Sequence, residues 1–393
     1  MKLLSRVHSF FKKPFFSDYR VLFALWMLLP IIATLTKLTK HNNFLIFKYV
    51  FWHTIEQLPL YAPYSEEYYD TNHYGPFFSL VVAPFAFEPV WLGLLLWSVA
   101  LAFGLYYAVR KLPMQKWQHI FILWFCAHEL LTALFMSQFN IAVVALIIAT
   151  FYCIQKEKDV WAAFFLMLGV FVKLYGIVGL AFFLFSKHKV KFSVSLLLWG
   201  GLMFIAPMLI SSPNYIIDQY VGWWESVSAK SGLNMFALAQ NVSLLGIIRK
   251  ITQCATYSDA WIILAGQVLF ALPYLRFKQY KNEAFRYAFL ASVLLFVVLF
   301  STGSESSSYI IALVGVVIWY VTAPWKRSKW DIALMVFALI LTSFSPSDLF
   351  PAYIRKEFVQ PYALKALPCV LIWLKLVYEM CRRDYAPQQV VER

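Results

Sequence analysis

The chain has 393 residues, of which 61 % are apolar and 19 % aromatic, while only 14 % are charged. An average soluble domain carries roughly 25 % charged residues, so this composition excludes a soluble fold, and it also excludes collagen, a disordered chain and a small disulfide scaffold. The net charge is +14, from 34 Lys and Arg against 20 Asp and Glu. In a membrane protein such an excess reflects orientation, and it does not indicate a nucleic-acid partner.

The predicted fold is an all-α, polytopic integral membrane protein with one transmembrane domain over residues 1–393. Apolar runs of about 17–25 residues are long enough to cross a hydrocarbon core of roughly 30 Å. Placing the basic clusters in the cytoplasm puts both termini there, with a basic head at 1–20 and a tail at 381–393. The predicted spans lie near 21–39, 89–109, 117–135, 140–155, 192–210, 259–275, 284–300, 308–323, 331–345 and 362–380.

Residues 40–76 form the first predicted extracytoplasmic loop, which begins as an amphipathic helix lying in the interface. Glu66, Glu67, Asp70 and His73 follow close together, beside several tyrosines. Acidic groups packed this closely raise one another's pKa, which makes a carboxylate a usable general base. The alternative is a solvated loop with ordinary charges. Residues 77–87 are apolar but too short to cross, so a re-entrant or interfacial helix is expected there.

His128 and Glu129 lie inside the third predicted span, where an ionisable side chain is energetically costly and marks a functional site by default. The alternative is that Glu129 only pairs with a neighbour such as His128 or Lys173. Gln138 and Asn140 follow at the outer end of this span. Their amides are suited to hydrogen-bond a sugar hydroxyl, although Asn140 alone also fits a helix cap.

Residues 160–185 are apolar but lie between two basic clusters, with Lys173 in their middle. A single span would place one cluster outside, so two half-helices, 160–172 and 174–185, are expected to dip into the membrane and return. Irregular backbone at that depth is tolerated only where protein or water covers it. A lysine between two half-helices meets an anion, for which a lipid phosphate is the obvious candidate, or it snorkels or pairs with Glu129.

Two later outer loops add further polar residues. The loop at 211–257 carries Asn241 within an Asn-x-Ser pattern, followed by Arg249, which fits phosphate binding or snorkelling equally well. Glu305 starts a serine run directly before a span, where it serves a site or remains a surface charge. The five cysteines form no CxxC pair, so neither a disulfide framework nor a metal site is predicted.

Several of these segments, taken in order, resemble glycosyltransferase family 87, the membrane mannosyltransferase-like proteins of the GT-C class. The stretch NNFLIFKYVFWHTIEQLPLY followed by YDTNHYGPFFSLVVAPFAF is similar to the family's first outer loop and the helix after it. SQFN resembles its Gly-Gln-x-Asn motif, VKLYG its Lys-x-x-Pro region and NVSLLG its Asn-x-Ser-Leu-x-Gly motif, and ESSSYIIA resembles a feature of one branch. The resemblance extends from about residue 42 to about residue 250.

The resemblance implies a GT-C-like bundle of roughly 10–13 transmembrane or re-entrant helices. It also implies a hexosyltransferase, mannosyltransferase-like, that moves a sugar from a polyprenyl-phosphate donor to an extracytoplasmic glycolipid or glycan acceptor with inversion. No other cofactor is expected. The family's first-loop acid, the expected general base, aligns with Asn43, and an amide cannot take up the proton. Gly75 and Gly176 also stand where the family often has proline.

These considerations assign each polar residue a role. The general base is expected among Glu66, Glu67, Asp70 and Glu129, and the donor phosphate is expected to bind Lys173, His73 and Arg249. The sugar or the acceptor is expected to contact Asn43, Tyr74, Gln138, Asn140, Tyr175, Asn241 and Glu305. The alternatives are a lipid-linked sugar flippase, which would also use a buried Lys/Glu pair and broken helices, and an inactive homologue that has lost its base.

Overall fold

The computed structural model describes residues 13–386, which form helices and loops with no strand among them. Four helices in this part of the chain are long and apolar enough to cross a membrane: Tyr19–Thr36, Val90–Lys111, Lys116–Phe135 and Lys189–Leu209. Shorter apolar helices accompany them, among them Asn140–Gln155 and Asp259–Leu275. The predicted all-α, polytopic membrane fold is confirmed. Parts of the predicted head (1–12) and tail (387–393) lie outside the described residues.

The helices follow the predicted spans closely. The long ones are α3 (Tyr19–Lys37), α6 (Val90–Lys111), α7 (Lys116–Phe135), α8 (Asn140–Gln155), α10 (Lys189–Ile205), α13 (Asp259–Ala271), α14 (Glu283–Leu299), α15 (Tyr309–Val321) and α18 (Leu367–Arg382). The shorter ones are α2 (Pro14–Ser17), α4 (Asn42–Glu56), α5 (Phe78–Val82), α9 (Asp159–Val172), α12 (Leu244–Thr252), α16 (Lys329–Phe337) and α17 (Ala352–Ile354).

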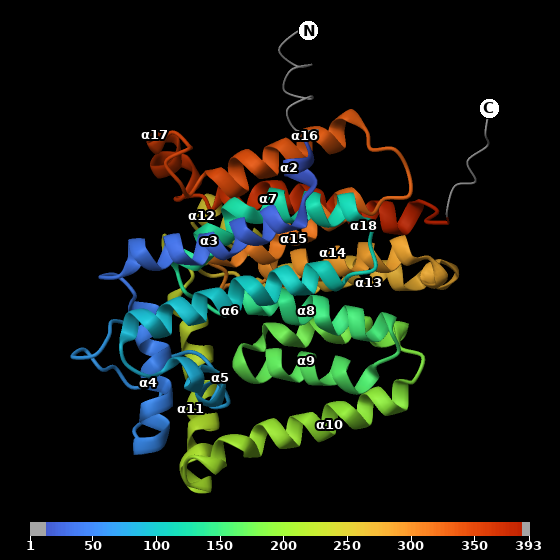
Figure 1. The fold of residues 1–393 in the computed structure, drawn as a ribbon. Coiled ribbons are helices and arrows are strands. Elements are labelled where there is room, and N and C mark those ends of the chain that lie inside the picture. The colour runs from blue at the N-terminus through green and yellow to red at the C-terminus, as the bar shows by residue number, and fades with distance from the viewer. Residues whose placement is uncertain (1–12, 387–393) are drawn as a thin grey trace, which may run out of the picture.

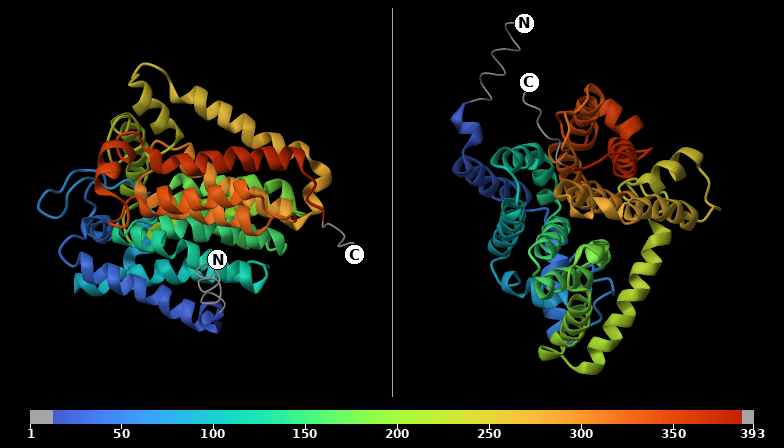
Figure 2. Two further views of the ribbon diagram at one scale, coloured as in Figure 1. Left: turned by 90° about the horizontal axis from the view of Figure 1, so that it is seen from above. Right: turned by 90° about the vertical axis from the view of Figure 1, so that its right-hand side faces the viewer.

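The long helices lie side by side across Figure 1, and α14 and α15 are at the centre of the bundle. Their residues are buried on nearly every side, as expected for helices that are apolar all round. In contrast, α10 and α13 present large apolar side chains outward, including Leu197, Trp261 and Val268. Figure 2 shows these two helices at the edges of the molecule. In a membrane protein, lipid covers such faces.

Short elements gather at one end of the bundle, on the left of Figure 1. They include α4, α5 and α12 together with the long helix α11 (Pro213–Leu233), which runs across the direction of the other helices. We expected only an outer loop at 211–257, because its polar residues exclude a span. The polar residues allow a helix nevertheless, and Pro213 at its first turn favours one. This end of the molecule holds the candidate site.

The last two predicted spans are less regular than expected. Residues 331–345 form α16 followed by a π-helical segment, Ala338–Phe344. The span predicted at 362–380 begins as an irregular segment in which Ala363 has a positive φ of 53°, and the helix α18 starts only at Leu367. A short 3₁₀ helix, η9 (Leu364–Ala366), follows this turn and carries the buried Lys365 directly before α18.

Candidate active site

The expected half-helices are α9 and the 3₁₀ helix η2 (Leu174–Phe185), which form a hairpin with Lys173 at its tip. Lys173 has an extended backbone, with φ −148° and ψ 113°, and this ends α9. At the open end of the hairpin the Ser186 hydroxyl donates to a carboxylate oxygen of Asp159 at 2.6 Å. The two ends of this segment therefore lie together, as a returning pair of half-helices requires.

Two glycines allow close packing at the hairpin tip. A Cβ on Gly176 would lie 2.4 Å from the carbonyl carbon of Gly169, so α9 and η2 approach each other only because a side chain is missing there. Gly75 fixes the first outer loop to the same place, because its N–H donates to the carbonyl of Val172 at 3.2 Å. A proline at position 75 would lack this donor, which gives a physical reason for the departure from the family pattern.

The Lys173 side chain faces a cavity of about 470 Å³ that opens between the first outer loop, the hairpin tip and α11. Its ammonium donates to the amide oxygen of Asn140 at 2.7 Å. It also lies over the rings of Tyr175, at 4.7 Å, and Tyr74, at 5.9 Å, where the ring faces attract a cation. The acceptor of its hydrogen bond is a neutral amide, so the positive charge of Lys173 is available to an anion.

Most of the predicted site residues line this cavity, although they come from distant parts of the chain. They are Asn43, Asp70, His73, Tyr74, Gln138, Lys173, Tyr175 and Glu305. The structure therefore brings together carboxylates, a lysine, amides and tyrosines from the first outer loop, the end of α7, the hairpin tip and the loop before α15. Trp223 and Lys230 of α11 complete the wall.

Glu305 is held in the cavity wall by two glutamine amides. Gln138 donates to Glu305 Oε2 at 2.7 Å and Gln240 donates to Glu305 Oε1 at 2.8 Å. Asn140 fixes the orientation of Gln138, because its amide nitrogen donates to Gln138 Oε1 at 2.8 Å while its oxygen accepts from Lys173. A continuous hydrogen-bonded chain thus connects the ammonium of Lys173 to the carboxylate of Glu305.

Asp70 lies at the mouth of the same cavity, in a strained backbone conformation with φ 69°. Its carboxylate is 3.9 Å from His73 Nε2 and 3.8 Å from Lys230 Nζ. The contact with His73, the charge of Lys230 and a backbone hydrogen bond from Thr71 lower the pKa of Asp70 to about 2, although partial burial opposes this. The expectation that the neighbouring acids raise the pKa is therefore wrong for Asp70, because its charged contacts are basic groups and not the two glutamates of this loop. His73 itself is oriented by a 2.9 Å hydrogen bond between its Nδ1 and the hydroxyl of Ser226.

Three of the acids predicted as possible bases lie away from the cavity. Glu66 is exposed on the first outer loop. Glu67 contacts His53 at 2.9 Å, and burial lowers the pKa of this histidine although the carboxylate raises it. Glu129 is fully buried and pairs with Lys365 at 2.8 Å, so it does pair with a neighbouring group, as the alternative held, but the partner is neither Lys173 nor His128.

Two other predicted residues also have structural partners outside the cavity. Arg249 is buried and forms an ion pair with Asp259 at 2.7 Å, while it also donates to the carbonyl of Cys254 at 3.0 Å. Asn241 has a positive φ of 51°, and its amide oxygen accepts from the hydroxyl of Ser243 at 2.7 Å. The similarity to the family's Asn-x-Ser motif thus corresponds to a turn beside the cavity wall.

Sequence reasoning assigned no role to three residues of this region. Gln240 precedes the recognised Asn-x-Ser pattern, and nothing in the sequence indicates that its amide reaches Glu305. Lys230 looked like one more charge of an outer loop. Lys365 did carry a signal, because it is an ionisable residue within the predicted span 362–380. Among residues 13–386, no cluster of three His, Cys, Asp or Glu side chains is arranged to hold a metal ion.

A second cavity of about 310 Å³ adjoins the first. The two share Met136, Ala239 and Glu305 in their linings. Apolar side chains such as Phe135 and Val359 form much of its wall, and Lys365 lies at its inner side. Glu305 therefore stands between two adjacent spaces.

Comparison with known families finds a match to glycosyltransferase family 87 over residues 72–302. The matched region includes the cavity residues from His73 to Thr302. A comparison with curated proteins returned no match.

Proposed function

The chain belongs to glycosyltransferase family 87, since the family match covers more than half of its 393 residues. It is therefore a membrane glycosyltransferase, and we propose the following reaction for it. It transfers a hexose, mannose by analogy with the family, from a polyprenyl-phosphate donor to a glycolipid or glycan acceptor outside the cytoplasm, with inversion. The observation that supports this most is the convergence of Lys173, Asp70 and Glu305 on one cavity. The donor already carries an activated sugar, so the reaction calls for no cofactor.

Lys173 is proposed to bind the donor phosphate. Its ammonium lies in the cavity wall with a neutral hydrogen-bond partner, and a phosphate would replace that partner with an anionic one. As the bond between the anomeric carbon and the phosphate oxygen breaks, its electron pair stays on the phosphate. A cation fixed beside the developing charge typically lowers the barrier by about 3–4 kcal/mol. His73, which lines the same cavity, is proposed to contribute a further hydrogen bond, whereas Arg249 is engaged with Asp259.

Asp70 is proposed as the general base, because it alone of the four predicted candidates lines the cavity. The acceptor hydroxyl attacks the anomeric carbon on the face opposite the phosphate, and its proton passes to the Asp70 carboxylate. A pKa of about 2 keeps this carboxylate ionised, so it accepts the proton only as the hydroxyl becomes acidic in the transition state. Asn43 occupies the family's base position and donates to the carbonyl of Met136 at 2.7 Å.

The remaining cavity residues are suited to hold sugar. Tyr74 and Tyr175 offer ring faces on either side of Lys173. The free lone pairs of the Glu305 carboxylate accept hydrogen bonds from hydroxyl groups, and the Asn43 amide nitrogen donates hydrogen bonds to them. Asn140 acts through Gln138, as its side chain is fully buried. We place this cavity on the extracytoplasmic side and both termini in the cytoplasm, following the distribution of basic clusters.

The test is consumption of donor by protein purified in detergent, where no membrane separates two compartments. Polyprenyl-phosphate mannose, glucose and galactose are supplied with a lipid and glycan extract from the host as acceptor, and released polyprenyl phosphate is measured. We expect release with one of these donors, and loss of release in Asp70→Asn but not in Glu66→Gln, whose acid lies outside the cavity. A flippase would leave every donor chemically unchanged, and that result would overturn the proposal.

A further inference from the structure

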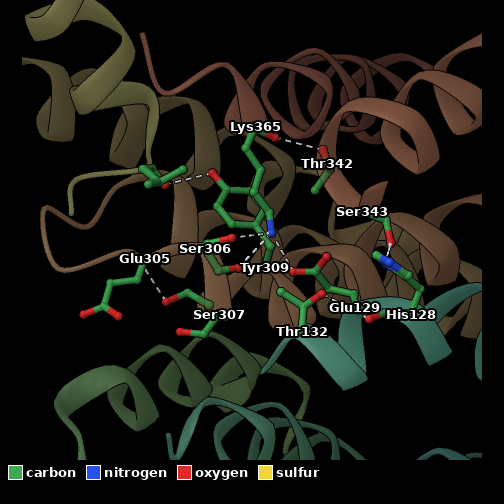
Figure 3. Close-up of polar contacts among 12 residues, drawn as sticks. His128, Glu129, Thr132, Glu305, Ser306, Ser307, Tyr309, Thr342, Ser343 and Lys365 are labelled. Carbon is green, nitrogen blue, oxygen red and sulfur yellow. Dashed lines mark hydrogen bonds and ion pairs between the residues drawn. The ribbon is translucent and has the colours of Figure 1, made fainter. Parts of the chain in front are cut away.

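Glu129 and Lys365 are fully buried charges that the proposed reaction does not use. Glu129 comes from α7 and Lys365 from the 3₁₀ helix η9 directly before α18, and their side chains meet at 2.8 Å (Figure 3). One carboxylate oxygen of Glu129 has no hydrogen-bond partner. Such a pair adds little net stability, because removing two charges from water offsets their attraction, and apolar residues often replace it without loss. Stability alone therefore does not account for it.

The contacts of Lys365 reach further than Glu129. Its ammonium also donates to the backbone carbonyl and to the hydroxyl of Ser306, each at 2.9 Å. An ammonium has three donors, and these three acceptors satisfy them. Ser306 directly follows Glu305, so the lysine holds the backbone of the turn from which the Glu305 side chain projects (Figure 3).

The rest of this turn is fixed from the opposite side. The Ser307 hydroxyl donates to Gln138 Oε1 at 2.9 Å, next to the amide that holds Glu305. The Ser304 carbonyl accepts from the N–H of Val242 at 2.8 Å. Another buried lysine, Lys250, donates to the carbonyl of Gln240 at 2.9 Å, and Gln240 is the second amide on Glu305. Lys365 thus anchors the backbone of the turn itself, while Lys250 anchors one of the two amides that hold the carboxylate.

We propose that the Glu129–Lys365 ion pair is a positioning pair, which fixes the turn 304–308 and thereby holds the Glu305 carboxylate where it contacts the sugar. Glu129 orients Lys365 and balances its charge, while Lys365 supplies the hydrogen bonds to Ser306. The inference rests on the proposed function for the role of Glu305, although the positioning itself is a property of the fold.

The central experiment replaces the pair with apolar residues of similar size, Glu129→Leu together with Lys365→Met. This double variant leaves no unpaired buried charge and is expected to fold, but it loses both bonds to Ser306. We expect kcat/KM for transfer to fall by about 30-fold or more, most of the loss expected from Glu305→Gln itself. Glu305→Gln is expected to cost about 100-fold in the native background but less than about threefold in the double variant, because residues that act through one another are not additive.

Two outcomes would overturn the proposal. One is a double variant that transfers at the native rate. The other is a loss from Glu305→Gln that is equal in both backgrounds, because it would show that the pair acts independently of Glu305. A matched control is Arg327→Met with Glu379→Gln, which removes another buried ion pair while keeping an acceptor for the indole N–H of Trp319. Arg327 and Glu379 line neither cavity, so this variant should keep native kcat/KM per folded molecule.

A second readout needs no catalysis and separates failure of this inference from failure of the proposed function. Amide hydrogen exchange of a peptide covering residues 301–308 should become faster in the Glu129→Leu, Lys365→Met variant, while exchange in α14 and α15 stays unchanged. Unchanged exchange in this turn would refute the positioning role even if the native protein transfers sugar. If the native protein transfers none of the tested sugars, the exchange result still decides whether the pair holds the turn.

Discussion

Lys173 is the residue on which the proposed reaction depends most. It carries its charge at the tip of a hairpin, and its hydrogen-bond acceptor, Asn140, is neutral. Two buried lysines of this end are committed to structural acceptors: Lys365 to Glu129 and Ser306, and Lys250 to the carbonyl of Gln240. Lys173 is only half-buried and lines the cavity, so it is better placed than these two to bind a phosphate.

We expect Lys173→Ala to lower transfer by about 100-fold or more, because one electrostatic contact to a developing oxyanion contributes about 3–4 kcal/mol. The variant should keep its native elution volume in detergent, since Lys173 forms no ion pair that folding needs. Lys187→Ala is the control, as this lysine is exposed and pairs with Glu157 at another part of the chain. Normal turnover by Lys173→Ala would show that Lys173 does not take part in the reaction.

The pH dependence of transfer tests Asp70. Its pKa of about 2 lies below the ordinary value of 3.8, so its ionised contacts stabilise the fold above pH 3.8 and are lost as the pH falls from there toward 2. We therefore expect no loss of kcat/KM from protonation of Asp70 between pH 8 and 5.

His73→Gln removes the largest cause of that low pKa, the contact between His73 and the carboxylate. The acid limb of the rate profile should then move to higher pH, toward the ordinary range of an aspartate. A native profile whose acid limb is centred above pH 5, and which does not move in His73→Gln, would contradict the role of Asp70.

At this scale the sequence identified eight polar residues that line the cavity but not their partners. Local motifs single out Asp70, Lys173 and Gln138, because each belongs to a pattern of polar residues in an apolar chain. Partners such as Gln240 for Glu305 and Lys365 for Glu129 lie 65 and 236 residues away. Such pairings depend on how the helices pack, which spacing along the chain does not reveal.

The hairpin of α9 and η2 is the element that sets the site. Its two helices hold Lys173 and Tyr175 at the tip, and the close approach of Gly169 and Gly176 determines how tightly they pack. The Gly75 N–H then attaches the first outer loop, which carries Asp70 and His73, to the same tip. Backbone contacts at these glycines thus set the position of Lys173, which is proposed to bind the phosphate, relative to Asp70, which is proposed as the base.

We expect Gly176→Ala to lower both stability and transfer, because its Cβ would lie 2.4 Å from the backbone of Gly169. Overpacking of this kind typically costs about 1–3 kcal/mol, and separation of the helices would displace Lys173. Gly201→Ala in α10 is the matched control, since a Cβ there meets nothing within 4 Å and should stabilise the helix by about 0.5–1 kcal/mol. Thermal midpoints followed by tryptophan fluorescence, together with kcat, check both expectations. If Gly176→Ala has the same thermal midpoint and the same kcat as Gly201→Ala, close packing at the tip does not position Lys173.

The sequence predicted the hairpin because Lys173 interrupts an apolar run flanked by basic clusters. It did not predict that the second half is a 3₁₀ helix or that 213–233 is helical, since neither feature depends on hydropathy. Packing against neighbouring elements decides both.

The whole molecule is a bundle whose cavity lies at one end, where α4, α11 and the loop before α15 meet (Figure 1). From the positive-inside rule we propose that this end lies outside the cytoplasm. Composition and hydropathy were sufficient to predict an all-helical membrane protein. They also predicted most helix positions, because each long apolar run must satisfy its own backbone hydrogen bonds in lipid.

Sidedness is testable with introduced cysteines in a Cys254→Ser, Cys381→Ser background, which removes the two partly exposed native thiols. Tyr69→Cys lies on the exposed first outer loop, and Lys187→Cys lies at the opposite end of the hairpin from Lys173. A membrane-impermeant maleimide added to right-side-out vesicles should label Tyr69→Cys at once and Lys187→Cys only after permeabilisation. The reverse pattern would place the cavity in the cytoplasm and refute the proposed topology.

The most direct test of the central claim, that this cavity holds a lipid-linked sugar for transfer, is a structure of the protein with a non-transferable donor analogue. A polyprenyl-phosphonate hexose of the sugar that the protein consumes is the probe. We predict that the phosphonate lies within hydrogen-bond distance of Lys173 Nζ, with the sugar between Asp70 and Glu305. A phosphonate bound elsewhere, such as beside Lys365 in the second cavity, or a sugar out of reach of Asp70 would contradict the account.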